Sequence, residues 1–475
     1  MTPQARALAR QRSVVGNRNR MLSSGYDSVN PGTKRKAVSS ILKHEDRQLK
    51  NNDRHKIIGS TRNLCRNFAL VAWAIRKHLD YVSAFDFQMR TDDDDLNNQI
   101  ESLMKVWQRP ANCDVCGRHS FSKMLRMFES RRTVDGDVFA LKLQTGSLQA
   151  IEGDRIRQPD QNTSDGTWYN GIRVNLAGAT AEYALWDRDN VSDRFQFSRN
   201  VPARNMIQHG YFDRFDQVRG VSPLAAAINS FQDVYEGIDY ALAKMKVEQL
   251  FALVFKRDAE VGMGTTSGTE SEGYEVNFGN GPVQLDLNPG DDAQFLKTDN
   301  PGSNTREFIN MVLSIAMKAL DLPYNFFDES HTNFFGSRSA WLLYDRSCQH
   351  KRADVLELLR KVTVWKLQQW IVSGDLRLPQ GMTVGDLQFE WVHRGMPWWD
   401  PAKEINGAVA AIKAGLDNPY RICKETGRGE YEENVDAIAK AMAYAREKGV
   451  PLEFVMQPEP VVEPVVEPNN SRGRQ

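Results

Sequence analysis

A helix predicted over residues 222–255 constrains the fold of this chain more than any other feature. Ser222 and Pro223 form a start signal, because serine caps helix N-termini and proline is favoured at the first helical position. Apolar residues then recur at intervals of three and four, at Leu224, Ile228, Phe231, Tyr235, Ile238, Leu242 and Met245. A helix of ~34 residues spans roughly 50 Å. Because that length exceeds one small core, the stripe predicts a packed neighbour.

A second helix, predicted over residues 305–323, supplies a suitable neighbour. Asn304 and Glu307 have the spacing of a capping box, and Pro323 disfavours helical geometry at the residue before it. One face of this helix is apolar, at Phe308, Met311, Ile315, Ala319 and Leu322. Residues 256–304 between the two helices lack a helical period and hold strand candidates at 274–278, 283–287 and 294–297. The pattern predicts two packed helices that flank a small β-rich insertion.

The residues before these helices divide into stretches with different patterns. Residues 1–59 are polar and rich in arginine and lysine, which predicts a flexible basic arm. A helix is predicted over about 60–80, and another follows the four aspartates at 92–95, whose charge suits a helix N-terminus. From 135 to 210, short alternating runs separated by glycine and aspartate predict strands. Residues 60–221 are therefore predicted to form a mixed α/β region.

The residues after the paired helices are predicted to be mainly helical. An aromatic, non-periodic loop is predicted over 324–337, and a long helix is predicted to begin at Ser337 and reach about Ser373 within the region 338–397. Helix start signals at Pro401 and Pro419, and a third helix from about Asn434, predict a compact module over 398–455. The run EPVVEPVVEP at 459–468 predicts that residues 456–475 form a disordered tail rich in proline and glutamate.

Composition narrows the class of protein. Lys and Arg total 61 and Asp and Glu also total 61, which excludes a uniformly basic nucleic-acid coat. Five cysteines, an odd number without a secretory signal, are typical of reduced thiols in a cytosol. No apolar run approaches the roughly 20 residues that cross a bilayer. We therefore expect a protein that is made in the cytoplasm and has no membrane partner.

Two groups of residues resemble metal sites. Cys113, Cys116 and His119 have the spacing of half a zinc site, but no second pair lies nearby, which favours an ordinary turn. Carboxylates at 92–95, at Asp135 and Asp137, and at Glu152 and Asp154 suggest a two-metal nuclease; a helix start and a turn explain them better. We expect no metal, no cofactor and no catalytic residue.

The nucleotide-binding loop GxxxxGK[ST] does not occur in the sequence. A chain without this loop is not expected to power a movement by nucleotide hydrolysis itself. Any ATPase that acts with it would therefore be a partner protein.

The order of these parts and their local amino-acid sequences resemble the lambda family of phage portal proteins over residues of about 60–455. The matching stretches are RNLCRNFALVAWAI (62–75), CDVCGRHSF (113–121), GDVFALKL (136–143), LQAIEGDRI (148–156), RGVSPLAAAI (219–228), LDLPYNFF (320–327) and PWWDPAKE (397–404). The resemblance implies an α+β portal fold assembled as a ring. Its parts would be a wing (60–221 and part of 338–397), stem helices (222–255 and 305–323), a clip (256–304), a tunnel loop (324–337) and a crown (398–455).

The resemblance also implies a function without catalysis. The chain would form a ring of twelve copies at one capsid vertex of the virion, the channel for genome packaging and ejection. Its partners would be other copies of itself, the terminase large subunit, major capsid and scaffold proteins, neck and head-completion proteins, and double-stranded DNA without sequence specificity. The alternatives are a metal-dependent nucleic-acid enzyme, or a neck or scaffold protein of the virion.

Candidate contacts to DNA follow from the basic and polar residues of the paired helices and the aromatic loop. A ring repeats each side chain around one axis, so a few basic residues produce a large local field, although each could equally lie on an ordinary solvated helix face. Contacts to phosphates rather than bases are expected, since a channel must pass any sequence. The candidates are Lys244, Lys246, Lys256, Arg257, Arg306, Lys318, Asn333, Ser337 and Arg338.

Overall fold

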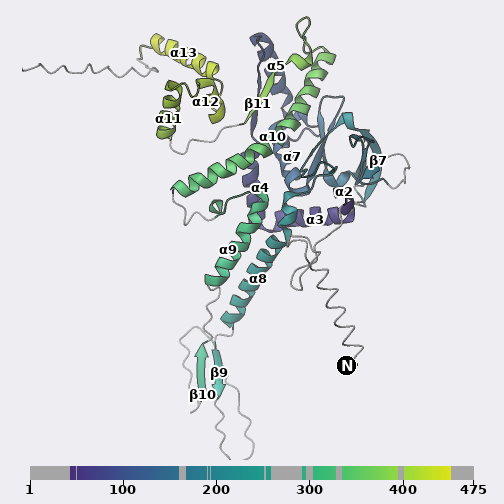
Figure 1. Ribbon diagram of the computed structural model, residues 1–475, viewed down its shortest axis with the longest axis vertical. Helices are drawn as coiled ribbons and strands as arrows, with labels where there is room; N and C mark the ends of the chain where they lie inside the picture. The colour runs from purple at the N-terminus through teal and green to yellow at the C-terminus, as the bar shows by residue number, and fades with distance from the viewer. Residues whose placement is uncertain are drawn as a thin grey trace, which may run out of the picture.

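A computed structural model of the chain describes residues 43–49, 51–159, 167–189, 191–192, 194–250, 253–257, 291–295, 303–327, 334–393 and 401–450. Figure 1 shows a body of helices and small sheets, from which two helices, α8 (Ile228–Leu250) and α9 (Ser303–Met317), extend together. Three further helices lie beside the body: α11 (Pro401–Lys413), α12 (Pro419–Thr426) and α13 (Tyr431–Glu447). The mixed helix and sheet architecture confirms the predicted α+β class.

The body begins with three helices, α2 (Glu45–Gln48), α3 (Asn51–Asn67) and α4 (Ala69–Val82). The chain leaves helical geometry at Phe68, whose ring centroid lies 5.4 Å from that of Tyr235 on α8. The predicted arm of residues 1–59 is therefore wrong from Glu45 onward, and the helix predicted over 60–80 is two helices. The start of α3 is polar in sequence and therefore lacks the apolar spacing that predicts a packed helix. Its residue Arg54 is nevertheless only 2% exposed, because it forms a buried ion pair with Asp137.

Two antiparallel sheets confirm the predicted β-rich region. One has the strand order β3 (Leu148–Glu152), β2 (Asp137–Lys142), β8 (Met206–Gly210). The other follows chain order through β4 (Thr167–Tyr169), β5 (Ile172–Val174), β6 (Thr180–Arg188) and β7 (Phe195–Pro202). Asn170 and Gly171 between β4 and β5 both have positive φ, which is the geometry of a tight hairpin turn.

Helices pack around these sheets. They are α5 (Asp94–Trp107), α6 (Pro110–Cys113), α7 (Phe121–Asp135) and the long α10 (Phe334–Ser373). The carboxylate of Asp93 accepts a hydrogen bond from the Leu96 amide at 3.1 Å, so the aspartates at 92–95 begin a helix as predicted. A further antiparallel pair joins β1 (Phe85–Met89) to β11 (Phe389–His393), which brings two distant parts of the chain together.

The paired helices differ from the prediction at their ends. Ser222 caps a short 3-10 helix, η4 (Pro223–Ala226), and α8 starts only at Ile228. After α8, the apolar and β-branched run continues as a strand, β9 (Leu253–Arg257), which pairs with β10 (Asp291–Phe295). The predicted helix 222–255 is thus too long at both ends. Of the strand candidates, 294–297 overlaps β10, whereas 274–278 and 283–287 lie outside the described residues.

The remaining boundaries are close to those predicted. Helix α9 ends in a 3-10 turn, η5 (Lys318–Leu320), and Asp321 is left-handed before Pro323. A second 3-10 turn, η6 (Tyr324–Phe326), opens the predicted loop, and residues 328–333 lie outside the described residues. Helix α10 begins at Phe334 rather than Ser337, so the loop before it is shorter than predicted. The helix ends at Ser373, as predicted. Helix α13 starts at Tyr431, earlier than the predicted Asn434.

One large apolar core joins the body to the near ends of the paired helices. It contains residues of α4, α5, α7 and α10 together with Phe231 of α8 and Leu313 and Met317 of α9. A second, smaller core lies among the sheet strands around Phe139 and Ile151. Helices α8 and α9 are therefore anchored at one end only.

Candidate functional site

The apolar stripe of α8 leaves the core partway along the helix. Ile228, Phe231 and Val234 are buried, Phe231 being only 1% exposed. Further along, Ile238 is 37% and Leu242 is 48% exposed, although both continue the same stripe. The predicted packed neighbour therefore covers the first part of the stripe, and the described residues leave Ile238 and Leu242 exposed.

Helix α9 has a comparable uncovered face. Leu313, Ala316 and Met317 point into the core and are buried. Phe308 is 62% and Ile315 is 61% exposed, and Met311 between them is also exposed. Exposed apolar side chains that share one face of a helix mark an interaction site more often than an ordinary solvated face does. We call this surface, formed by Ile238 and Leu242 of α8 and Phe308, Met311 and Ile315 of α9, the stem apolar face.

Charge is separated along the same helices. Asp233, Glu236 and Asp239 are exposed in the half of α8 nearer the body. Lys244 and Lys246 are exposed toward its far end, and Arg306 is exposed at the start of α9. Because the two helices run in opposite directions (Figure 1), these three basic residues lie at the same far end of the pair. The structure thus groups three of the nine candidate DNA contacts.

The other candidates lie elsewhere. Lys256 and Arg257 are in strand β9 rather than at a helix end, and the register places them opposite Asp292 and Asp291. Lys318 is exposed in η5, at the end of α9 that lies near the body. The nine candidates therefore do not form one continuous site within a single copy.

Arg338 and Ser337 belong to the first turns of α10, not to a loop. An Nη atom of Arg338 lies 3.6 Å from a carboxylate oxygen of Glu404, so this residue links α10 to α11. Asn333 lies outside the described residues. Arg338 already has an acidic partner, and a DNA phosphate would have to compete with it.

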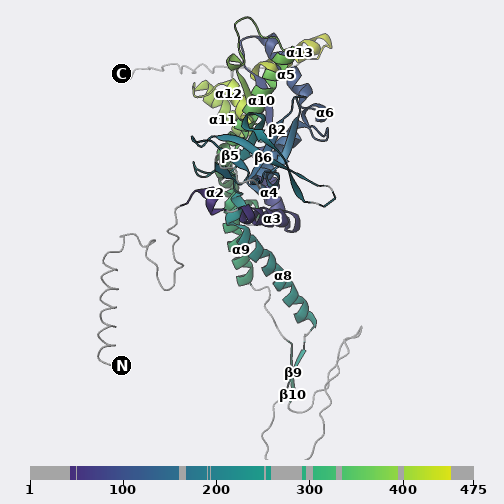
Figure 2. The same cartoon turned by 90° about the vertical axis from the view of Figure 1, so that its right-hand side faces the viewer.

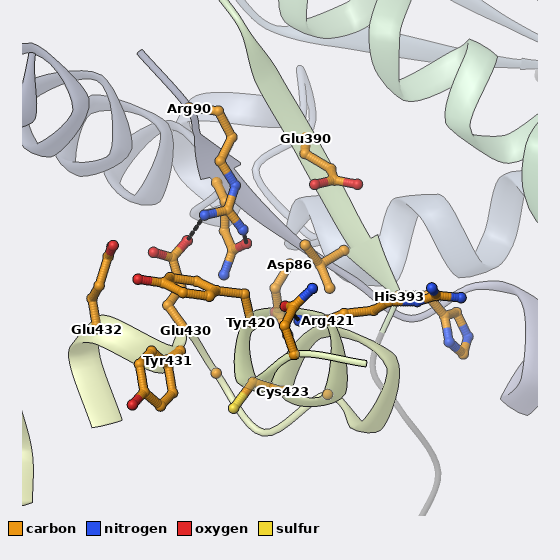
Figure 3. A pocket seen from close by; sticks show the side chains of 15 residues that line it. Asp86, Arg90, Glu390, His393, Tyr420, Arg421, Cys423, Glu430, Tyr431 and Glu432 are labelled. Carbon is orange, nitrogen blue, oxygen red and sulfur yellow. Dashed lines mark hydrogen bonds and ion pairs between the residues drawn. The ribbon is translucent and has the colours of Figure 1, made fainter. Parts of the chain in front are cut away.

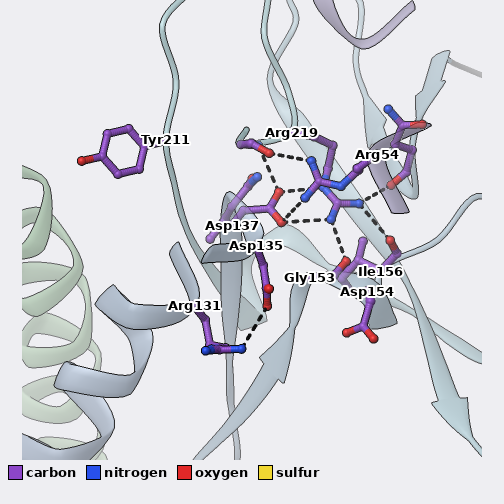
Figure 4. A network of polar contacts seen from close by, with 12 residues as sticks. Arg54, Arg131, Asp135, Asp137, Gly153, Asp154, Ile156, Tyr211 and Arg219 are labelled. Carbon is purple, nitrogen blue, oxygen red and sulfur yellow. Dashed lines mark hydrogen bonds and ion pairs between the residues drawn. The ribbon is translucent and has the colours of Figure 1, made fainter. Parts of the chain in front are cut away.

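Asp137 forms the centre of a buried ionic network in the body (Figure 4). Its carboxylate accepts hydrogen bonds from Arg54 at 2.6 Å, from Arg219 at 2.7 and 3.0 Å, and from the Gly220 amide at 3.1 Å. Arg219 also donates to the Gly153 carbonyl at 2.8 Å. Despite its burial, the positive charge of Arg219 and Arg54 lowers the pKa of Asp137, while burial lowers the pKa of Arg54 to about 10.

The neighbouring carboxylates are also engaged by arginine. Arg62 contacts Asp135 at 2.7 Å, Glu152 at 2.9 Å and Asp154 at 3.4 Å, and Arg188 contacts Asp154 at 3.5 Å. Each carboxylate of the supposed two-metal pairs is thus neutralised by a guanidinium, which leaves no uncompensated charge for a divalent cation. Their role is to join α3, the end of α7 and the sheet.

A second buried network was not predicted from the sequence. Glu129 of α7 lies 3.0 Å from His78 Nε2, 3.1 Å from His209 Nε2 and 3.0 Å from Arg132. Arg132 in turn pairs with Asp354 of α10 and lies over the ring of Tyr211. The three cationic or polar partners hold the pKa of Glu129 well below its usual range despite its burial. The network connects α4, α7, β8 and α10.

The Cys113 and Cys116 pair forms a turn, as the sequence favours. The Asp114 carboxylate accepts hydrogen bonds from the amides of Cys116, Arg118 and His119 at 3.0 to 3.1 Å. Cys113 is buried and Cys116 is exposed, and burial raises the pKa of the Cys113 thiol to about 11.

A cavity of about 360 Å³ lies where the C-terminal helices meet the body (Figure 3). Strands β1 and β11 line one side, with Asp86 and Glu390, and α12 and α13 line the other, with Tyr420 and Tyr431. Arg90 of the body lies 3.2 Å from Glu430, at the start of α13. This ion pair and the cavity walls position the C-terminal helices on the body.

The described residues contain neither a cluster of metal-ligating side chains nor a helix that could span a membrane. Within these ranges, no group of three or more histidine, cysteine, aspartate or glutamate residues is arranged to hold a metal ion. Likewise, in the part of the chain that the structure describes, no helix combines enough length and apolar character to cross a bilayer.

Comparison with known proteins identifies the family. Residues 35–352, more than half of the chain, match the family described as "Phage portal protein, lambda family". The chain therefore belongs to the lambda family of phage portal proteins. A protein described as a "probable portal protein" of Halomonas phage phiHAP-1 is 24% identical over 401 residues, which is 76% of this chain and 73% of that protein.

Solved structures of gene transfer agent particles contain similar chains. A chain in the virion of a native particle is 14% identical with a TM-score of 0.43, and covers 80% of this chain and 99% of its own length. A chain in the neck of an empty particle is also 14% identical, with a TM-score of 0.45, and covers 77% of this chain and 93% of its own length.

Proposed function

We propose that this chain is the subunit of a portal ring at one vertex of a tailed-phage capsid. The ring would contain twelve copies and surround the channel through which DNA enters and leaves. The observation that carries the proposal is the helix pair α8 and α9 in a member of this family. The pair exposes the stem apolar face and has basic residues at the end far from the body. Portal proteins are structural components, and the proposal assigns no catalytic step to this chain.

The stem apolar face supports assembly. A single copy leaves Phe308, Met311 and Ile315 in water, and each buried side chain of this kind contributes about 1.5 to 3 kcal/mol when covered. A contact between different faces of adjacent copies closes into a ring when the rotation between them closes. The stem apolar face would form part of that contact.

The basic residues support passage of DNA. Lys244, Lys246 and Arg306 would be repeated by every copy, so that a small number per chain gives a strong positive field around the axis. Such contacts act on phosphates and carry no sequence information, as a channel for any genome requires. DNA movement itself would come from a partner motor, the terminase large subunit, because the sequence holds no nucleotide-binding loop of its own.

The parts of the fold would then have distinct partners. The body would be the wing, α8 and α9 the stem, and the region around β9 and β10 the clip, facing terminase during packaging and the neck afterwards. The residues between η6 and α10 would approach the channel, and α11 to α13 would form a crown toward the capsid interior. Capsid and scaffold proteins would contact the outside of the ring.

Electron microscopy of purified protein tests this proposal. We expect rings with a central channel for the natural chain, and loss of rings for the double variant Phe308→Asp and Ile315→Asp with an unchanged circular dichroism spectrum. Val372→Asp, on an exposed position of α10, is the matched control and should assemble. Assemblies without a central channel would instead favour a neck or scaffold protein.

A further inference from the structure

A groove in the body is lined by positively charged side chains to which the proposed function assigns no role. Its volume is about 520 Å³, and it lies between the sheets and the second half of α10. Trp365 and Val364 of α10 form one wall, and Met206 and Ile207 of β8 form part of the other, with Phe212 beside them. Apolar and aromatic side chains therefore form part of the lining, beside polar and charged ones.

The charged side chains that line this groove are all cationic. They are Lys142 of β2, Arg204 beside β8, and Arg360 and Lys361 of α10, and no carboxylate is among the described residues that line it. Arg360 and Lys361 share one carboxylate outside the lining, that of Glu357, at 2.9 and 3.5 Å. Four cations around one groove, drawn from three separate elements, attract an anionic occupant.

Lys142 and Arg204 strengthen this conclusion. Within the described residues, neither side chain has a carboxylate partner at ion-pair distance. Partial burial lowers the pKa of Lys142, and no acidic group opposes this effect. A half-buried ammonium group without a counter-charge is unfavourable, so an acidic ligand in the groove would relieve that cost.

We infer that this groove binds residues 459–468 of a neighbouring copy of the same chain. The inference rests on the proposed ring, because it needs a second copy beside the first. The segment reads EPVVEPVVEP and carries Glu459, Glu463 and Glu467 with no basic residue. Its charge is thus opposite to that of the groove.

The rest of the segment also suits the walls. A proline follows each glutamate, and pairs of valine lie between these units. Proline-rich segments bind in aromatic-lined grooves at low entropic cost, because their extended conformation is largely preformed. In that conformation the rise is ~3.1 Å per residue, which places successive glutamates ~12 Å apart. Valine and proline would contact Trp365 and Phe212 while the carboxylates contact the cations around them.

A peptide also fits this groove better than DNA does. Cationic side chains and the partly exposed apolar side chains of Trp365 and Val364 line the groove together, and a duplex that presents phosphates and sugars would leave the apolar ones uncovered. A peptide with alternating acidic and apolar residues covers both kinds of wall. Binding of DNA is therefore an outcome of the test that would contradict the inference.

The arrangement of the chain favours a neighbouring copy as the donor. Helices α11 to α13, after which the segment follows, lie on the opposite side of α10 from the sheets that form the groove (Figures 1 and 2). Residues 451–458 separate Val450, the last described residue after α13, from the segment, and eight residues span at most about 29 Å even when fully extended. In a ring, opposite sides of one copy face two different neighbours, so head-to-tail exchange of this segment is geometrically natural.

A photo-crosslinking experiment on the assembled full-length chain tests the inference. The crosslinker p-benzoylphenylalanine replaces Trp365, and copies grown in heavy and light isotopes are mixed before assembly. We expect mass spectrometry to find crosslinks from position 365 to residues 459–468 in heavy-light pairs. The same crosslinker at Val372, which is exposed on α10 outside the groove, is the control and should not reach this segment.

Charge variants sharpen the test. Replacing Glu459, Glu463 and Glu467 by glutamine should lower the crosslink yield at least tenfold, and these three positions lie outside the described residues. Lys142→Glu with Arg204→Glu should have the same effect, whereas Arg377→Glu, an exposed control, should not. Combining the groove reversal with lysine at the three glutamate positions should restore the yield to within about threefold.

Several outcomes would overturn the inference. Crosslinks from position 365 to DNA or to another segment would do so, as would an unchanged yield in the glutamine variant or a failure of the reversed pair to restore it. Rings that form without this crosslink would remove the inference and leave the proposed function in place. A natural chain that forms no rings would remove the proposed function and the neighbouring-copy assignment together.

Discussion

The body and the paired helices differ in where their side chains find partners. In the body, buried charges such as Asp137 and Glu129 have their partners within the same copy, often from distant parts of the chain. In the paired helices, Phe308 and Ile315 are apolar and exposed. The described residues of the body therefore satisfy their buried charges within one copy, whereas the paired helices leave apolar side chains exposed, which the proposed ring would cover. Stability should depend on the first region and assembly on the second.

Removing the centre of the ionic network should have the largest effect. Asp137→Ala leaves Arg54 and Arg219 buried without their carboxylate, and breaking a buried pair costs about 3 to 5 kcal/mol. We expect a loss of about 5 kcal/mol, because two cations are affected, measured by urea unfolding. Asp53→Ala, an exposed position on α3, should change stability by less than about 0.5 kcal/mol. A loss below about 1 kcal/mol for Asp137→Ala would show that the body does not depend on this network.

The same substitution at two phenylalanines compares the regions directly. Phe231→Ala opens a cavity in the core and should destabilise the chain by about 3 kcal/mol. Phe308→Ala should change the stability of an unassembled copy by less than about 0.5 kcal/mol but reduce the yield of rings. Urea unfolding at low concentration and sedimentation velocity at high concentration measure the two effects. Equal effects on stability would contradict the distinction between core and stem apolar face.

Acid should weaken the body before it weakens the assembly surface. Burial lowers the pKa of His78 and His209 below the ordinary 6.5, and lowers that of His55 and His393 to about 4. The unfolded chain then binds more protons than the folded chain, so stability is present above pH 6.5 and is lost as pH falls toward the folded pKa values. Glu129, whose pKa is also lowered, adds a further loss below pH 4.5.

Thermal unfolding between pH 7.5 and 5.0 measures this effect. We expect the melting temperature to fall by several degrees over that range. His350→Gln, at an exposed position, should leave the fall unchanged. A melting temperature that stays constant to pH 5.0 would mean that these histidines are not held neutral by burial.

Arg338→Glu should have the smallest effect on stability. Its ion pair with Glu404 is partly exposed, and such pairs contribute about 0 to 1 kcal/mol. We expect stability to change by no more than about 0.5 kcal/mol and rings to form, while DNA packaging or retention falls. Packaging at the natural level would show that this residue does not contact DNA.

The sequence predicted those elements whose signals are local. Ser222 with Pro223, Pro323 and the spacing of apolar residues indicated two helices around an insertion, and the long helix ends at Ser373 as expected. The predicted C-terminal end of α8 was wrong because the apolar run continues into strand β9, where pairing with β10 overrides helical spacing. Local propensity could not decide this, because the partner strand lies about 35 residues further along the chain.

The buried networks could not be predicted for a related reason. Glu129 meets His78 and His209, which are 51 and 80 residues away in the sequence, and Arg132 meets Asp354 at a separation of 222. No short motif connects such positions. The same limit made Asp135 and Asp137 resemble metal ligands, because their arginine partners at Arg62, Arg54 and Arg219 lie far away. Three of the basic candidates were grouped at one end of the helix pair, which the antiparallel arrangement alone explains.

The pairing of β1 with β11 sets a schedule for the synthesis of each copy. Strand β1 ends at Met89 and its partner begins at Phe389, so about 300 residues must leave the ribosome before this sheet can close. At 5 to 20 residues per second, that interval is roughly 15 to 60 s. During it, the stem apolar face has already emerged while the body that anchors it is still unfinished. A chaperone that covers this face would therefore protect nascent copies from aggregation, as would a low concentration of nascent chains. Fast overexpression should favour aggregates over rings.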